Sequence, residues 1–240
     1  MGIIVTLLLG AMSIPIILAV IPAIVLMVVI YRQDNIEKEP PGLVLRLVLL
    51  GALSTVFAGV LERMLTFLLD LVLRNPYTHL YRFILYFCIV AIVEEGVKYM
   101  FLRTTWTHPS FNYRFDAVVY GVAVALGFAA AENLLYVFYL GVGITPLRAI
   151  TAIPLHCICG VFMGHYYGMA AACERYGLYA KKQQYHVLSL LVPVLIHGWY
   201  DFAATAGGIL MELAFFAFVV ALDLIAIMSV KRYAREDEEL

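Results

Sequence analysis

Apolar residues recur along this chain in long uninterrupted runs, and most polar residues gather in short stretches between them. A helix needs about 20 predominantly apolar residues to cross the ~30 Å hydrocarbon core of a bilayer. Seven runs come close to that length or exceed it, so the pattern predicts seven transmembrane helices. They cover residues 5–30, 43–62, 80–101, 116–139, 149–172, 186–205 and 208–230.

Two of the apolar segments need a separate interpretation. Residues 64–73 are short, flanked by charges and interrupted by Asp70, which favours a helix in the membrane interface, with an eighth span as the alternative. Residues 5–30 lack a basic start and a small-residue cleavage site, so we expect a retained span and not a signal peptide.

The distribution of Lys and Arg between alternate loops predicts the orientation. With the N-terminus outside, twelve of these residues lie on the inner side: Arg32, Lys38, Arg46, Lys98, Arg103, Arg114, Arg175, Lys181, Lys182, Lys231, Arg232 and Arg235. The four on the outer side are Arg63, Arg74, Arg82 and Arg148. The positive-inside rule therefore predicts an outer N-terminus and a cytoplasmic C-terminus in the plasma membrane, with residues 231–240 as a short solvated tail.

Composition supports this membrane assignment. Hydrophobic residues make up 64% of the 240 residues and charged residues 14%, which is more apolar surface than one soluble core of this length hides. We expect a single domain over residues 1–240, an all-α polytopic helix bundle in the lipid bilayer. A net charge of −1 without a long basic run gives no reason to expect a nucleic-acid partner. The four cysteines form no CxxC pair and are expected to be buried free thiols.

Ionisable residues remain inside the predicted spans. A charged side chain at the bilayer centre costs roughly 2.5–3.5 kcal/mol even on insertion scales, so such residues are functional candidates. In VAIVEEGVKYMF, Lys98 lies within helical reach of both Glu94 and Glu95. One glutamate can pair with Lys98 while the other stays free as a general base. The alternative is a structural ion pair, with Lys98 reaching towards the headgroups.

The span at 149–172 carries a histidine at the head of a stripe of small residues. His156, Gly160, Gly164 and Gly168 follow one another at intervals of four residues, a spacing that lets another helix approach closely. His156 should therefore face the bundle interior, whereas His165 points the opposite way and is set aside.

Two other spans contain polar residues one helical turn apart. Glu132 follows Phe128 by four residues, and Asp201 follows His197 by the same interval. A carboxylate and an imidazole on one helix face can act together, because the acid orients the ring or because both address one ion or one substrate oxygen.

Together these motifs resemble the PrsW family of intramembrane proteases, which is related to the CAAX prenyl proteases. The motifs are E94-E95-x-x-K98, F128-x-x-x-E132, H156-x-x-x-G160 and H197-x-x-x-D201, on four successive hydrophobic segments. The stretch YRQDNIEKEP is similar to the family's N-terminal loop, so the resemblance covers residues 31–202. The wider CAAX group has histidine in place of Glu132 and asparagine in place of Asp201, which places this chain on the PrsW side.

The resemblance implies hydrolysis of a peptide bond in or near the membrane segment of a single-pass membrane protein, typically an anti-sigma factor. Glu94 or Glu95 would activate the attacking water, and the other glutamate and Lys98 would complete the charge network. Asp201 would orient His197. The implied metal ligands are His156, His197 and Glu132.

Two mechanisms remain open at this stage. Zinc held by those three residues would suit a hydrolase, but no HExxH motif is present. Glutamate-based hydrolysis with histidines stabilising the oxyanion fits the same residue types. In either case the depths must match, yet Glu95 lies six residues from the inner end of its span and Glu132 and His156 about sixteen, a gap of ~15 Å. We expect tilted or broken helices around a water-filled cavity lined by Glu95, Glu132, His156 and His197.

Two alternatives to a protease follow from the same residues. Buried Glu212 and Asp223 on the last span would suit a proton-coupled transporter, although no corresponding halves of a repeat are visible. A non-catalytic scaffold would use the polar residues to hold helices together. The sequence leaves the oligomeric state open.

Overall fold

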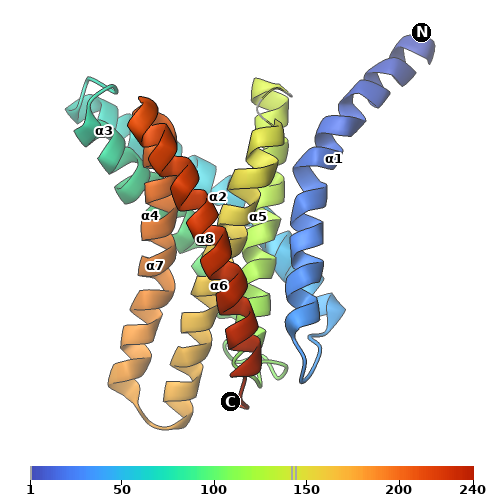
Figure 1. Cartoon of the computed structure of the whole chain (residues 1–240), viewed down its shortest axis with the longest axis vertical. Helices are drawn as coiled ribbons and strands as arrows, with labels where there is room; N and C mark the ends of the chain where they lie inside the picture. Colours follow the sequence, from blue (N-terminus) through green and yellow to red (C-terminus); the bar gives the residue numbers. More distant parts are fainter. Residues whose placement is uncertain (1, 142, 144) are drawn as a thin grey trace.

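The protein forms one bundle of long helices that run alternately up and down (Figure 1). The computed structural model describes the backbone of residues 2–141, 143 and 145–240, and the side chains of residues 16, 17, 19–139, 141, 143 and 146–240. Within this part of the chain there is no β-strand, only a single bridge between Tyr113 and Glu239. The predicted all-α architecture is confirmed.

Each predicted span corresponds to a helix. The long helices are α1 (Gly2–Gln33), α2 (Pro41–Val72), α5 (Asp116–Leu140), α6 (Thr145–Arg175), α7 (Tyr179–Ala206) and α8 (Ile209–Arg235). The predicted third span is a composite of α3 (His79–Phe83), the π-helix η1 (Ile84–Val90) and α4 (Ala91–Leu102), followed by the short 3₁₀ turn η2 (Arg103–Thr105). Among the described residues, the helices long and apolar enough to cross a membrane are α2, α5, α6, α7 and α8.

Residues 64–73, which we expected in the membrane interface, do not form a segment of their own. These residues continue α2 to Val72 without a break, and the described chain contains no eighth span. With 32 residues, α2 is about 48 Å long, which is more than the hydrocarbon core needs. The charge that suggested an interface, Asp70, instead accepts a hydrogen bond of 2.6 Å from the Tyr81 hydroxyl on α3.

Helix α5 is the centre of the bundle and packs closely against α6. A Cβ atom added to Gly164 would lie 2.2 Å from the carbonyl oxygen of Ala117, and one added to Gly160 would lie 2.8 Å from that of Gly121. Only glycine permits backbones to approach so closely, so the small-residue stripe has the predicted function.

A similar glycine contact joins α5 to α2 on its other side. A Cβ atom on Gly51 would lie 2.0 Å from the carbonyl oxygen of Val124, and one on Gly127 would lie 2.0 Å from that of Val48. Helix α5 is thus fixed between two neighbours, and its polar residues are held at a defined depth.

The predicted difference in depth between the glutamates of α4 and the polar residues of α5 and α6 does not occur. The reason is that α4 ends before it reaches the level at which α5 begins. Helix α4 ends at Leu102, and the connection through residues 103–115 continues towards the end of the bundle where α5 begins. Trp106 in this connection packs on Tyr167 with ring centroids 4.9 Å apart. The inner end of the third span therefore lies beyond residue 101, and the α4 glutamates reach the level of α5 and α6 polar groups.

Two smaller expectations also need correction. The tail is not simply solvated, because Asp237 accepts a hydrogen bond of 2.8 Å from the Phe115 amide and Leu240 donates one of 2.6 Å to Asn112. Of the four free cysteines, only Cys88 is exposed, on the surface of η1, and the others are buried as expected.

Candidate active site

Lys98 on α4 is the centre of a buried charge cluster. Its ammonium donates hydrogen bonds of 2.8 Å to Glu95 and 3.2 Å to Glu94, so the expectation that one glutamate stays free of the lysine was wrong. It also lies 4.0 Å from the ring centroid of Phe128, a cation–π contact that anchors α4 to α5. Glu95 and Lys98 have no exposed surface and Glu94 is 5% exposed.

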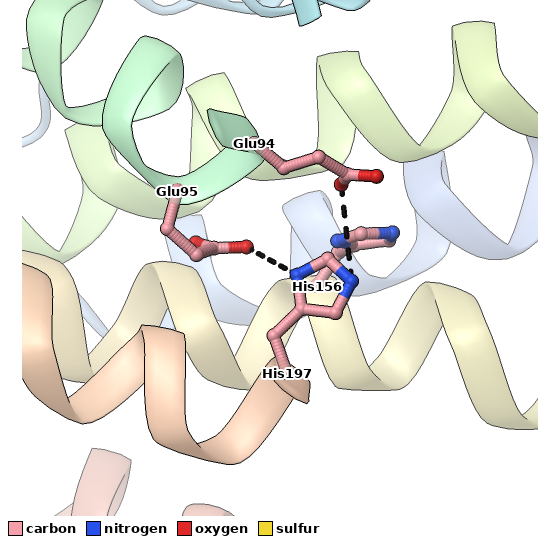
Figure 2. A group of neighbouring side chains, drawn as sticks. All are labelled: Glu94, Glu95, His156 and His197. Carbon is pink, nitrogen blue, oxygen red and sulfur yellow. Dashed lines mark hydrogen bonds and ion pairs between the residues drawn. The ribbon is translucent and has the colours of Figure 1, made fainter. Parts of the chain in front are cut away.

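His197 on α7 is held by the glutamate pair (Figure 2). Its Nδ1 lies 2.8 Å from Glu95 Oε1, and its Nε2 lies 3.9 Å from Glu94 Oε2 and 3.4 Å from Asp201 Oδ2. Asp201 therefore contacts His197 as expected, but Glu95 makes the shorter contact. A carboxylate at Nδ1 fixes the ring orientation and leaves Nε2 directed at Glu94.

His156 on α6 completes the cluster. Its Nε2 lies 3.0 Å from Glu132 Oε2 on α5, and its Nδ1 lies 3.0 Å from the Lys98 ammonium. The rings of His156 and His197 are nearly perpendicular, with centroids 5.1 Å apart. Figure 2 shows both imidazole rings next to the carboxylates of the two α4 glutamates. Residues from four predicted spans thus meet at one place.

A cavity of about 1100 Å³ opens beside this cluster. Its polar lining includes Glu94, Glu132, His156 and His197, whereas Glu95 and Lys98 lie behind its wall. We expected Glu95 to line the cavity, but the α4 glutamate that does so is Glu94. The carboxylate of Glu94 is therefore open to the cavity, whereas Glu95 contacts His197.

Arg148 on α6 belongs to the site, although the sequence analysis counted it among the outer loop charges. Its guanidinium lies 2.7 Å from Glu132 Oε2, donates to Asn133 at 2.9 Å and stacks over the ring of Tyr136. The available signal was its position two helical turns before His156, which puts both residues on one helix face.

Glu62 on α2 is a second residue that the sequence analysis missed. It lines the cavity, and its Oε1 is buried with no partner among the described residues. Its position along the face of Gly51, Thr55 and Ala58 would have indicated an inward side chain, but hydropathy alone placed it at the end of a span.

The cluster fits a divalent metal ion in donor type and spacing. Glu94, Glu95, His156 and His197 each offer a ligand atom, and these atoms lie within 4.8 Å of one another. Two imidazoles and carboxylate oxygens are ligands that zinc accepts in hydrolases. Glu132, expected as a third ligand, lies outside this group and is paired with Arg148.

The remaining candidates lie apart from the cluster. His165 stacks on Tyr233 with centroids 3.6 Å apart, and it lines no part of the cavity, as expected. Glu212 is exposed at the cavity rim, and Asp223 is not among the lining residues. The two acids of α8 therefore do not form a polar path through the bundle, as a proton-coupled transporter would need.

Comparison with known proteins gives one consistent result. Residues 39–228 match the family described as PrsW family intramembrane metalloprotease. Protease PrsW of Shouchella clausii is 32% identical over 218 residues, which cover 90% of this chain and 95% of that protein. Protease PrsW of Halalkalibacterium halodurans is 36% identical over 76% of this chain and 80% of its own length, and that of Bacillus subtilis is 33% identical over 77% and 80%. No solved structure matches the chain significantly.

Proposed function

This chain belongs to the PrsW family of intramembrane proteases, and from that premise we propose that it hydrolyses a peptide bond in or beside the membrane segment of a single-pass membrane protein. The observation that carries this proposal is the position of Glu94. Its carboxylate lies at the wall of a cavity inside the bundle, next to two histidines and a buried lysine.

Glu94 is the general base in this proposal. It is the α4 carboxylate that faces the cavity, and a carboxylate within hydrogen-bond reach of a water can take its proton as the water attacks the carbonyl carbon. Lys98 holds Glu94 in place and supplies positive charge 3.2 Å from its carboxylate. Glu95 is a positioning residue, because it contacts His197 and has no exposed surface.

His197 stabilises the carbonyl oxygen as negative charge develops there. His156 is a positioning residue, because its two nitrogens contact Glu132 and Lys98. His197, held through Nδ1 by Glu95, presents Nε2 to the cavity between Glu94 and Asp201. A protonated ring in that position donates a hydrogen bond to the oxygen and later a proton to the departing amine. The peptide C–N bond breaks, the water oxygen remains on the carbonyl carbon, and the amine leaves with the proton.

The family description as a metalloprotease adds a role for a bound ion. His156, His197 and Glu95 would hold it, which leaves Glu94 as the base, and zinc is our choice because both imidazole and carboxylate donors are present. Bound zinc would polarise the scissile carbonyl and lower the pKa of a water molecule towards 7.

The cavity offers a lateral route for a membrane-embedded substrate. Helices α2 and α5 are in contact at Thr55 and Phe128, but beyond this point α2 packs on α3 and α5 is tied to α6 through Arg148. In Figure 1, α3 at the end of α2 and the upper end of α5 lie well apart. Phe67 on α2 and Tyr139 on α5 line the cavity and are 61% and 81% exposed, so the space opens between these helices.

A substrate that enters between α2 and α5 must itself be in the membrane. We propose a single-pass protein, and by the family resemblance a membrane-anchored anti-sigma factor. Cleavage near its membrane segment would release the soluble domain from its anchor.

The test is quantitative profiling of new protein N-termini in membranes from cells that express the wild type or Glu94→Gln at equal levels. New termini near the membrane segment of a single-pass protein should appear with the wild type only, because the amide cannot take a proton from water. The matched control is Glu212→Gln, the same change at the cavity rim, which should retain cleavage.

The same assay with purified protein tests the metal. Proteolytic activity should be lost when a chelator removes the metal and should return when zinc is added. Activity that persists after chelation would show that the side chains alone carry out the reaction. Identical profiles for the wild type and a folded Glu94→Gln variant would overturn the protease proposal.

A further inference from the structure

A second group of buried carboxylates lies at the other end of the bundle from the cavity mouth. Asp34 and Glu39 are in the connection between α1 and α2, and Asp116 is the first residue of α5. Their exposed fractions are 1%, 1% and 0%. One carboxylate oxygen from each residue lies within 4.8 Å of the others. The stretch YRQDNIEKEP, singled out in the sequence, supplies two of the three residues, and the proposed reaction uses none of them.

Three of the six carboxylate oxygens in this group are buried and have no hydrogen-bond partner in the described part of the chain. Both oxygens of Asp34 and Oδ1 of Asp116 are buried and unpartnered among the described residues. The other oxygen of Asp116 accepts the amides of Asn112 and Tyr113, at 3.0 and 2.6 Å. The Tyr120 hydroxyl donates to Glu39. Side chains and amides thus orient Glu39 and Asp116, whereas the carboxylate of Asp34 accepts no hydrogen bond from the described residues.

Among the described residues, no cationic side chain forms an ion pair with these carboxylates. The charge of Lys38 acts on Asp34, but its ammonium forms no ion pair with the carboxylate and donates to the backbone carbonyls of Tyr31, Arg32 and Asp34. Burial raises the pKa of Asp34 to about 6 and also raises the pKa of Glu39. Buried carboxylates without a counter-charge are strongly unfavourable, so the group requires a positive ligand or protons.

We propose that Asp34, Glu39 and Asp116 bind one hard divalent cation of the Ca²⁺ or Mg²⁺ type, at a site separate from the catalytic cluster. Hard cations select all-oxygen ligand sets, and this group offers oxygen only, with no histidine or cysteine in it. The unpartnered oxygens of Asp34 and Asp116 are the atoms left available for an ion.

The bound cation joins two parts of the chain that are far apart in sequence. It links the α1–α2 connection to the beginning of α5, the helix that carries Phe128 and Glu132 at the candidate active site. Because the ion binds only the folded arrangement of the three carboxylates, it stabilises that arrangement by mass action.

The first test is direct binding of Tb³⁺, a luminescent substitute for Ca²⁺, to the full chain purified in detergent and stripped of divalent ions. Tyr120 contacts Glu39 and can sensitise the emission. We expect a saturable signal that Ca²⁺ or Mg²⁺ displaces, and the more effective competitor identifies the ion. Asp34→Asn should weaken Tb³⁺ binding by about tenfold or more.

Two control variants assign the signal to this site. Glu37→Gln removes the same charge from the same connection, from a residue outside the group, and should leave Tb³⁺ binding unchanged. Glu94→Gln should also leave it unchanged, which separates this cation from any metal at the catalytic cluster. The result is therefore independent of whether the protease proposal holds.

Thermal unfolding supplies a second readout that a merely structural carboxylate would not give. Without divalent ions, Asp34→Asn should unfold at the same or a higher temperature than the wild type, because it removes an unneutralised buried charge. With Ca²⁺ or Mg²⁺ at millimolar concentration the order should reverse. Absence of any ion effect on the wild type, or an equal effect on Asp34→Asn, would show that protons and not a cation neutralise the group. If Asp34→Asn does not fold, Glu39→Gln takes its place.

Discussion

Two adjacent glutamates illustrate how position alone separates the roles of identical side chains. Glu94 lines the cavity, and Glu95 lies behind it against His197. Adjacent helical residues point about 100° apart, so one faces the substrate space and the other faces the supporting cluster. Glu95→Gln should consequently act through the orientation of His197, whereas Glu94→Gln removes the base.

Arg148 is predicted to position Glu132 and, through it, His156. Arg148→Gln should lower kcat by about 10–100-fold, the usual effect of losing a group that orients a site residue. The single variants Arg148→Gln and Glu132→Gln and the double variant should be clearly non-additive, because Arg148 and Glu132 form a pair at 2.7 Å. Both the fall in kcat and the non-additivity are measured from the cleavage rates of the purified variants.

Arg82→Gln is the matched control for this experiment. Arg82 also lies in the predicted outer part of the bundle, but it donates to the Ala206 carbonyl and lines no part of the cavity. Its loss should leave kcat unchanged. Additive effects in the Arg148 and Glu132 cycle would show that the arginine does not act through the glutamate.

The catalytic candidates on α4, α6 and α7 could be predicted because a charge inside an apolar run stands out. Arg148 and Glu62 do not stand out in the same way, since Arg148 precedes its predicted span and Glu62 is the last residue of its own. Long side chains reach inward from such positions, and only the packing of α2, α5 and α6 shows that they do.

At the scale of elements, the π-helix η1 sets the direction of α4. The wider turn of a π-helix rotates the side chains of the following helix α4 about the helix axis, relative to a regular α-helix. Such segments are frequent at functional sites. Gly198 on α7 packs directly on Phe87 of η1, where an added Cβ would lie 2.6 Å from the ring. Uniform 3.6-residue periodicity cannot predict this turn, so the sequence alone could not decide which glutamate faces the cavity.

The gap between α2 and α5 gives a prediction for substrate access. Gly59 lines the cavity, and an added Cβ there meets no atom within 4 Å. Gly59→Leu should therefore fill the route and lower cleavage without loss of stability, as measured by the thermal unfolding temperature. Gly96→Leu makes the same change on α4, also in open space but away from the cavity, and should cleave normally. Normal cleavage by Gly59→Leu would place substrate entry elsewhere.

For the whole molecule, the order of the long helices could be predicted from hydropathy, and the relative depth of their polar residues could not. The two termini lie at opposite ends of the bundle, as an odd number of crossings requires (Figure 1). Lys98 and Arg148 prove to be buried ion-pair partners and not loop charges, yet the remaining bias of eleven to three still predicts an outer N-terminus.

Labelling of intact cells with a membrane-impermeant maleimide tests this orientation. Tyr77→Cys, in the exposed connection after α2, should be labelled from outside, and Ala180→Cys, at the exposed start of α7, should be labelled only after lysis. The unmodified chain reports the background from its four native cysteines. The opposite result would invert the bundle and place the cavity mouth on the cytoplasmic side.

The glycine contacts of α5 divide the protein into a rigid and a movable part. Backbones that touch at Gly51, Gly127 and Gly164 cannot slide or tilt without a clash, so α5, α6 and the first half of α2 act as a fixed frame. Among the described residues, the second half of α2 makes no such glycine contact with α5, and Thr55 is the last residue of α2 that donates a hydrogen bond to it. If the gap between α2 and α5 widens to admit a substrate helix, the second half of α2 must therefore pivot near Thr55. This movement changes the shape of the entrance and leaves the catalytic residues on α5 and α6 in place.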